Sequence, residues 1–406
     1  ADAGYSALVN DGELTAVAVT VRDGRQGLDL LAPAGAALTN RGRATLAGAT
    51  VTGNQHRDAV VRNEAGAALT VTGSTFSSNP GEFGAEVTVA NAGTLTASDS
   101  RLPGGVTTTG SATLTRVQLS GRPGLSNGGT ARLELSTVAD GELGIHNSGR
   151  LTVDHTAVRG NTGVHGVEDG AGGIVNSGSL RLQHSAVTGN SARGTGGIRS
   201  TGTLWMSDTT VAANMQLSST TADLADERNP AGAGGVTVAA GSARLTGVTL
   251  ARNAYRSDPY LPAAASASGG LNNTGGTVTL ADTVLGQNTS DQSASSQDCA
   301  GTLTSGGYNL VHRATGCAFT RGIGDRTGLD PRLGVLANNG GRTPTLLPQA
   351  GSPLVDSGSP TVPGSTTAGA CTARDQRGVT RPRDGNGDGS TRCDIGAAER
   401  RSTTTG

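Results

Sequence analysis

The sequence predicts an all-β chain folded as a right-handed, single-stranded parallel β-helix of about eleven coils with a C-terminal, disulfide-bearing cap. Three observations predict this fold: an apolar frame that recurs eleven times, a glycine before ten of the copies, and an asparagine before six. A fixed frame with variable spacing is typical of a stacked solenoid. The copies begin at Leu14, Ala44, Leu69, Leu95, Ala112, Ala131, Leu151, Leu180, Leu204, Ala243 and Val278.

Each copy supplies two short strands. Leu180 and Leu182 illustrate the first strand, in which alternate side chains share one face, and Val187 points a second strand inward. Each coil buries three or four aliphatic side chains at about 1.5–3 kcal/mol each. Ordering each residue costs about 1–2 kcal/mol, so a lone coil cannot fold and neighbours must stack. Parallel crossovers in one sheet are nearly always right-handed, which gives the predicted hand.

Glycine and asparagine occupy the turn before each first strand. The glycine two residues before the strand, such as Gly149 or Gly178, predicts a turn with a positive φ. The asparagine two residues earlier predicts a ladder of stacked side chains that bond to one another and to the turn backbone. These asparagines are Asn10, Asn40, Asn91, Asn127, Asn147 and Asn176.

Composition excludes two classes of partner. The 406 residues carry a net charge of −1, which argues against a nucleic acid held by charge. No apolar run is long enough to span a membrane. No signal peptide opens the sequence at Ala1, so we expect a mature or trimmed chain.

Extra residues collect between copies, mainly in 162–171, 215–233 and 254–268. We expect these insertions to project from one edge, where a binding surface would form. Ordinary solvated loops are the alternative. Trp205, between two core positions, is predicted to point outward and to pack on a neighbouring strand. The candidate ligand contacts in the insertions are Asp223, Asp226, Tyr255, Arg256, Asp258 and Tyr260.

Motifs in both parts of the chain resemble known families. Gly172-Gly173-Ile174 and the closing Phe76-Ser77-Ser78-Asn79 resemble the repeat of polymorphic outer membrane proteins, which are surface adhesins. The C-terminal part resembles a choice-of-anchor Q module over roughly 298–399. Its motifs are Asp298-Cys299, Gly307-Tyr308-Asn309-Leu310, Asp330-Pro331, Asn338-Asn339-Gly340-Gly341, Gly351-Ser352-Pro353, Asp375-Gln376-Arg377-Gly378 and Cys393-Asp394-Ile395-Gly396.

The resemblance implies a secreted bacterial cell-surface protein with a solenoid similar to that of pectate lyases. We expect a β-helix domain over 1–288 and a C-terminal cap over 289–406. The function expected is structural or adhesive, with a cell-surface polysaccharide, a host surface or the chain itself as partner. Because the first coil begins near Ala1, we expect either that a removed N-terminal segment once covered this end or that another molecule stacks on it. The second alternative would give end-to-end assembly into filaments or arrays.

The four cysteines all lie in the C-terminal part. Of the three pairings, the local one, Cys299 with Cys317 and Cys371 with Cys393, is the one we expect. Disulfides imply an oxidising compartment.

A short acidic loop suggests calcium. Asp384, Asn386 and Asp388 stand at the first, third and fifth positions of a calcium-type loop, with Gly389 sixth. The glutamate expected at position twelve is absent, and Asp394 is the proposed substitute. The alternative is a turn that binds nothing.

Catalysis is the runner-up function, as a polysaccharide lyase or hydrolase that uses the insertion loops. We name no catalytic residue, because such sites need clustered carboxylates that the frame does not provide. One column stands out: the position four after each copy's first residue holds His155, His184 and Asp208 in successive coils. These side chains would bind a metal or share a proton, although a turn column that faces water is the simpler interpretation.

Overall fold

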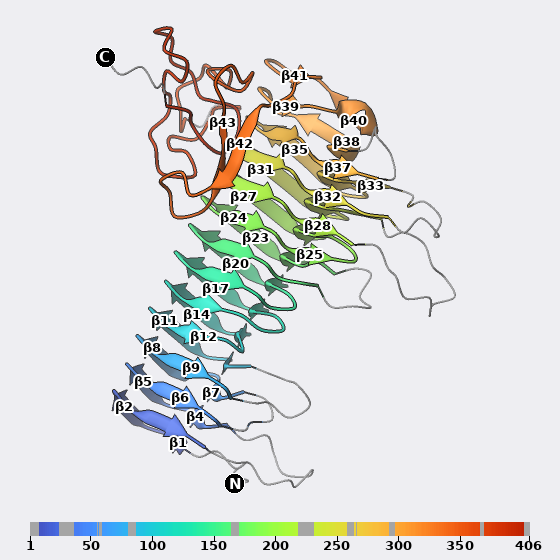
Figure 1. The fold of residues 1–406 in the computed structure, drawn as a ribbon. Coiled ribbons are helices and arrows are strands. Elements are labelled where there is room, and N and C mark those ends of the chain that lie inside the picture. The colour runs from blue at the N-terminus through green and yellow to red at the C-terminus, as the bar shows by residue number, and fades with distance from the viewer. Residues whose placement is uncertain are drawn as a thin grey trace. The chain divides into compact units, whose positions relative to one another are not determined.

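The predicted parallel β-helix is confirmed by a computed structural model of the chain (Figure 1). It describes residues 8–23, 36–54, 56, 59–79, 87–163, 170–217, 231–257, 264, 266–291, 297–365 and 369–401. The named strands of these residues pair in parallel, except for β42 with β43, and none of the described residues lies in an α-helix. The chain divides into two compact units, Ala1–Thr152 and Val153–Gly406.

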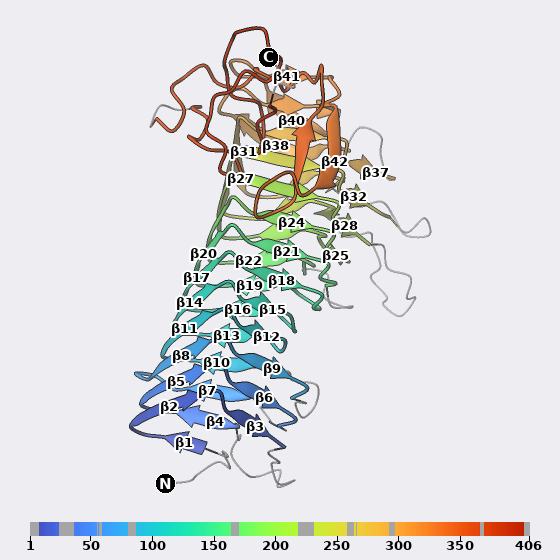
Figure 2. The same ribbon diagram turned by 60° about the vertical axis from the view of Figure 1, so that its left-hand side comes forward.

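The N-terminal unit stacks three columns of strands, which Figure 2 separates. The first column contains β1 (Leu8–Asn10), β4 (Leu38–Asn40), β7 (Val61–Asn63), β10 (Val89–Asn91), β13 (Val106–Thr108), β16 (Leu125–Asn127) and β19 (Ile145–Asn147). The second contains β2 (Glu13–Val17), β5 (Arg43–Ala47), β8 (Ala68–Thr72), β11 (Thr94–Ser98), β14 (Ser111–Thr115) and β17 (Thr130–Glu134). The third contains β3 (Thr20–Arg22), β6 (Thr50–Thr52), β9 (Thr75–Ser77), β12 (Arg101–Leu102), β15 (Gln118–Leu119) and β18 (Thr137–Ala139).

The apolar frame sets the register of these columns. Ala44 of β5 pairs with Leu69 of β8, and Leu69 pairs with Leu95 of β11, so equivalent positions stack directly. All three side chains are buried. The core of this unit is therefore a series of small aliphatic layers, which the low aromatic content permits.

The glycine column has a different cause from the one predicted. Of the ten glycines, only Gly241 has a positive φ. A Cβ on Gly42 would lie 2.1 Å from the carbonyl oxygen of Gly12, and a Cβ on Gly202 would lie 2.1 Å from that of Gly178. The prediction of a left-handed turn was wrong here. At positions such as Gly42 and Gly202, glycine is required because the carbonyl of the preceding coil lies too close for a Cβ.

The asparagine ladder is confirmed, for example between Asn10 and Asn40, and it gains Asn63, which the prediction did not include. Asn40 Nδ2 donates to Asn63 Oδ1 at 2.8 Å, and Asn63 Nδ2 donates to Asn91 Oδ1 at 2.7 Å. Each amide also donates to turn carbonyls, as Asn40 does to that of Ala68. The ladder therefore satisfies buried turn backbone between strands, where an unpaired carbonyl would be costly.

The C-terminal unit continues the same plan. Its first column contains β22 (Ile174–Asn176), β26 (Ile198–Ser200), β30 (Val236–Val238), β34 (Leu271–Asn273) and β38 (Cys299–Ser305). Its second column contains β23 (Ser179–Gln183), β27 (Thr203–Ala212), β31 (Ser242–Ala251), β35 (Thr277–Ala281), β38 and β40 (Cys317–Thr320), with β20 (Arg150–Asp154) at the division between the units. Its third contains β21 (Ala157–Arg159), β24 (Ala186–Thr188), the ends of β27 and β31, β36 (Val284–Gly286), β39 (Leu310–Val311) and β41 (Arg326–Thr327).

Short strands line the edge where the insertions occur. The insertions lie largely outside the described residues, but their ends pair in parallel. These strands are β25 (Ser191–Ala192), β28 (Met215–Gln216), β29 (Gly232–Ala233), β32 (Ala254–Tyr255), β33 (Ala267–Ser268) and β37 (Thr289–Ser290). A second ladder, Asn161–Asn190–Asn214–Asn253–Asn288, ends on Asp298 and supports this edge.

The coils extend beyond the predicted boundary at residue 288, because β38 to β41 add to the parallel columns. A 3₁₀ turn, η2 (Ala314–Gly316), precedes β40. Both predicted disulfides form, Cys299–Cys317 and Cys371–Cys393.

Residues 330–365 and 369–400 pack against the side of the coils and are called the lateral segment here. It opens with an antiparallel pair, β42 (Leu333–Ala337) and β43 (Thr345–Pro348). Leu346, Leu354 and Ile395 of this segment share a core cluster with Ala212 and Ala251 of the coils. Figures 1 and 2 both place it beside the coils of β27 and β31. The predicted cap therefore includes a flank as well as further coils.

Candidate metal centre

The strained position of each coil lies in the turn that follows the strand of the second column, such as β20 or β23. The residue four after the first frame residue has a positive φ in all eleven copies, from 44° at Asp208 to 61° at Gly247. Only three copies use glycine there. A side chain in this left-handed conformation costs on the order of 1–3 kcal/mol, and such residues cluster at functional sites. This column of turn residues is therefore a candidate functional site.

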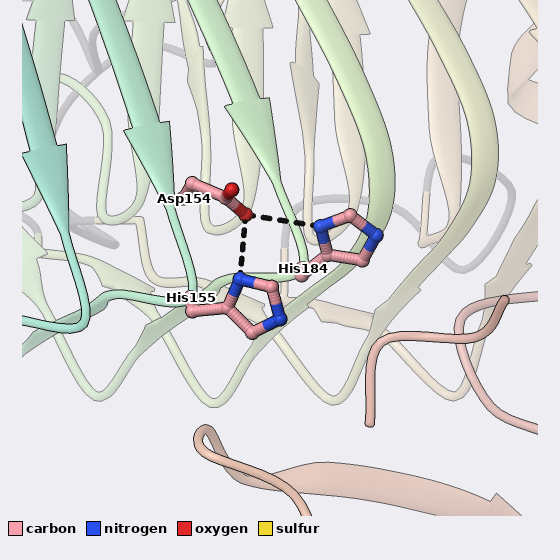
Figure 3. A group of neighbouring side chains, drawn as sticks. All are labelled: Asp154, His155 and His184. Atoms are coloured by element: carbon pink, nitrogen blue, oxygen red, sulfur yellow. Dashed lines mark hydrogen bonds and ion pairs between the residues drawn. The ribbon is translucent and has the colours of Figure 1, made fainter. Parts of the chain in front are cut away.

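Two histidines of this column meet one carboxylate at the ends of β20 and β23 (Figure 3). Asp154 Oδ1 lies 2.8 Å from His155 Nδ1 and 2.9 Å from His184 Nδ1. The imidazole rings stack, with centroids 4.7 Å apart and planes inclined by 22°. Both histidines have a φ of 46°, so equivalent turns hold the rings in parallel.

The electrostatics of this group favour an ionised carboxylate. Burial raises the pKa of Asp154, but hydrogen bonds from His184 and Gln183 and the nearby imidazoles outweigh it and lower the pKa to about 2. The hydrogen bond to Asp154 raises the pKa of His184 above its usual value. The group therefore presents one anionic oxygen and two imidazole nitrogens, a donor set suited to a transition metal ion or to proton sharing.

Asp208 is not part of this group, and its predicted exposure to water was wrong. Its side chain is buried beneath the lateral segment, where Thr372 Oγ1 donates to Asp208 Oδ1 at 2.5 Å. Thr343 Oγ1 of the same segment donates to the carbonyl of His184. The lateral segment thus covers the column from His184 onward, which no local sequence pattern indicates.

Arg381 of the lateral segment neutralises the covered part of the column. Its guanidinium lies 3.6 Å from Asp208, 3.7 Å from Asp282 and 3.3 Å from Glu399, and all four side chains are buried. Burial raises the pKa of Asp208 to about 6 and that of Asp282 to about 7, although Arg381 opposes both shifts. Burial likewise raises the pKa of Glu399. This cluster holds the segment on the coils and faces no solvent.

The predicted calcium residues separate into two places. Asp384 accepts hydrogen bonds from the backbone of Gly387 and Gly389, and Asn386 Oδ1 accepts one from Asp388. Asp394, the proposed substitute ligand, is buried and accepts bonds from the backbone of Asp356 and Arg400. Calcium at this loop stays a prediction.

The predicted ligand contacts lie at the insertion edge. Tyr255 is fully buried on β32, whereas Arg256 beside it is exposed. Asp223, Asp226, Asp258 and Tyr260 lie outside the described residues.

A surface platform escaped the sequence analysis. Trp205 of β27 points outward as predicted, but 53% of it stays exposed. It pairs in register with Arg181 of β23 and Arg244 of β31, which are also exposed. Each of these three residues comes directly after the first frame residue of its copy. Aligning the copies at that position would have predicted the row.

Comparisons with known proteins find no matching family model, curated protein or solved structure. Among the described residues, no helix is both long and apolar enough to cross a membrane.

Proposed function

We propose that this chain is a secreted structural and adhesive β-helix protein of a bacterial cell surface that binds an acidic polysaccharide. The observation that carries the proposal is the row Arg181–Trp205–Arg244 on the outer face of the second column. An exposed tryptophan offers a flat face for a sugar ring, and guanidinium groups on both sides suit carboxylate or sulfate groups.

The row lies on regular strands, which suits a binding surface. Positions within a parallel sheet are held more precisely than positions on loops, so little ordering entropy is lost when a polymer binds. Adjacent strands lie about 4.8 Å apart, so the backbones of the two arginines flank that of Trp205 at one strand spacing on either side. An extended polymer that runs across the strands would contact all three side chains.

The placement of carboxylates supports binding rather than cleavage. Polysaccharide hydrolysis needs two acidic groups that reach the substrate. Asp208, Asp282 and Glu399 are buried under the lateral segment. A pocket of about 310 Å³ near His56 and Pro103 has no acidic residue among its described lining. These three carboxylates and this pocket therefore give no support to the enzyme alternative.

The two disulfides support secretion, since such bonds persist in oxidising compartments. End-to-end assembly is the second part of the expected role. Leu8 of β1 is exposed, whereas its register partner Leu38 in the next coil is buried, so a further coil, of this chain or of a second copy, would cover Leu8. Light scattering over a wide concentration range tests assembly, and a constant monomer mass would contradict it.

Binding is tested with polygalacturonate as the acidic probe and dextran as the neutral one. We expect the wild type to bind the acidic polymer alone and to release no reducing ends or unsaturated products. Trp205→Ala should weaken binding by about 2 kcal/mol or more, as for a central interface residue. Arg132→Ala, at the same outward position of β17, is the matched control and should bind normally. Equal binding by both variants would contradict the platform, and product release would favour the enzyme alternative.

A further inference from the structure

We propose that Asp154, His155 and His184 form a binding site for a divalent transition metal ion of the zinc type. The site is separate from the polysaccharide platform and does not depend on the proposed function. Among the described residues, this is the one place where three side chains of metal-ligating type bring their donor atoms within 4.8 Å of one another.

The donor atoms already converge. Oδ1 of Asp154 lies 2.8 Å and 2.9 Å from the two Nδ1 atoms, and each of the three residues offers a donor atom within 4.8 Å of the others (Figure 3). Zinc bonds to nitrogen and oxygen are about 2.0–2.2 Å long, which places tetrahedral donors about 3.4 Å apart. An ion therefore needs the Asp154 carboxylate to move outward by about half an ångström and the two stacked rings to rotate until their Nδ1 lone pairs point at the same spot.

The histidine backbones are fixed before an ion arrives. His155 N donates to the carbonyl of Gln183, and His184 N donates to that of Ser207, each at 3.2 Å. The carbonyl of His184 accepts a bond from Thr343 of the lateral segment at 3.1 Å. Because both turns are held by neighbouring coils, binding needs small side-chain movements only, which lowers its entropic cost.

Solvent reaches the site from one side. The side chains of His155 and His184 are 32% and 24% exposed, whereas that of Asp154 is 12% exposed. Three protein donors and an open side leave room for a water ligand, as in three-ligand zinc sites. Before Nδ1 can bind an ion, a neutral ring must move its proton from Nδ1 to Nε2, and a charged ring must release its Nδ1 proton to solvent, so binding to a charged ring releases one proton.

The chemistry of the donors selects the class of ion. Two imidazoles and one carboxylate suit zinc, nickel, cobalt or copper, whereas calcium and magnesium prefer oxygen donors alone. The ionised Asp154 supplies the negative charge that offsets the ion. An ion here would tie the turn after β20 to the turn after β23 and thereby stabilise consecutive coils.

The test uses Zn²⁺ alone, added to the full chain freed of metal by a chelator, with calorimetry for affinity and thermal unfolding for stability. Cobalt substitution adds a visible spectrum that reports nitrogen ligation. The variants are His155→Gln, His184→Gln and Asp154→Asn, and the matched control is His146→Gln on β19, a histidine outside the group.

The wild type and the His146→Gln variant should bind one Zn²⁺ per chain at this site and unfold at a higher temperature with the ion. Each of the three site variants should lose affinity by at least about tenfold, the lower end of the loss caused by removing an outer-shell partner alone. They should also lose the cobalt spectrum and the thermal shift. Thermal unfolding of each variant and of the wild type without metal shows whether a variant has lost its fold. Asp154→Asn keeps a hydrogen-bond acceptor, so it is the variant expected to disturb the fold least. No binding by the wild type, or binding that all variants retain, would overturn the proposal.

Discussion

Arg381 forms a buried ion pair with Asp208, with 3.6 Å between Nη2 and Oδ1. The pair joins the lateral segment to the turn column of the coils. The next coil has Gly247 at this position, and an added Cβ there would approach Asp208 Oδ1 to 3.0 Å. Arg381 also donates to the carbonyls of Asp394 and Gly396, so one side chain binds both the coils and its own segment.

Replacing Arg381 with methionine should detach or destabilise the lateral segment. The change leaves Asp208, Asp282 and Glu399 buried without their cation, and loss of one partner of a buried pair costs about 3–5 kcal/mol. Urea unfolding followed by circular dichroism measures the loss. Arg374→Met, which removes an exposed arginine of the same segment, should change stability by less than about 0.5 kcal/mol. Equal effects of the two changes would contradict the role of Arg381.

Stability should fall as the pH rises from about 4 to about 7. Burial raises the pKa of Asp208 to about 6 and that of Asp282 to about 7, and it also raises the pKa of Asp394. In this range the folded chain keeps protons that the unfolded chain has lost, so a higher pH favours unfolding. The raised pKa of His184 extends the fall to higher pH, because the stabilisation by its charged form is complete below the ordinary imidazole pKa of 6.5 and is lost as the pH rises through the raised value. Melting temperatures at pH 5 and pH 8 test the slope.

Asp208→Asn provides the variant for this slope. Without the carboxyl of Asp208, the difference in melting temperature between pH 5 and pH 8 should shrink. Asp99→Asn is the control, because Asp99 is exposed and its bond to Arg116 lowers its pKa, so it titrates below this range. An unchanged slope in Asp208→Asn would show that the pH dependence arises elsewhere.

Two glycines of one column should respond differently to alanine. A Cβ on Gly42 would lie 2.1 Å from the Gly12 carbonyl oxygen, whereas a Cβ on Gly12 would meet nothing within 4 Å. Gly42→Ala should therefore cost about 1–3 kcal/mol through overpacking. Gly12→Ala should be neutral or slightly stabilising, since neither residue has a positive φ. Thermal unfolding of both variants measures this, and equal losses would indicate a conformational rather than a steric cause.

The sequence was enough to predict the coils but not the reason for their glycines. Periodic apolar residues such as Leu180 and Leu182 determine which side chains face inward, so the strands and asparagine ladders follow from local spacing. The left-handed turn lies instead at positions such as His184, where asparagine and glycine do not predominate. The abundance of glycine before each strand therefore predicted a left-handed turn at the wrong place in the coil.

Removing one member of the second asparagine ladder should destabilise the C-terminal unit. Asn214 donates to Asn253 Oδ1 and to the carbonyl of Val187, and it accepts from Asn190. Asn214→Ala removes the acceptor of the buried Asn190 backbone N–H and the side-chain donor to the Val187 carbonyl, at about 1–3 kcal/mol for each group left unpaired. Asn338→Ala, an exposed position, is the control. Denaturant unfolding compares them, and a ladder variant as stable as the control would contradict the role of the ladder.

The sites depend on contacts that spacing does not reveal. His155 and His184 were recognised as neighbours because they share one position of the frame. Asp154 was missed, since its carboxylate turns from the end of β20 toward both rings. Burial of Asp208 was also missed, because Thr372 and Arg381 reach it from a distant part of the chain. Long-range packing of this kind needs the structure.

The proposed adhesive surface is tested most directly by the fluorescence of Trp205, which is the chain's single tryptophan. Its exposed indole should be quenched readily by acrylamide in the free protein. Titration with polygalacturonate should shift its emission and protect it from the quencher, whereas dextran should do neither. Binding of the acidic polymer with unchanged emission and quenching would contradict the account, because the polymer would then bind away from the platform.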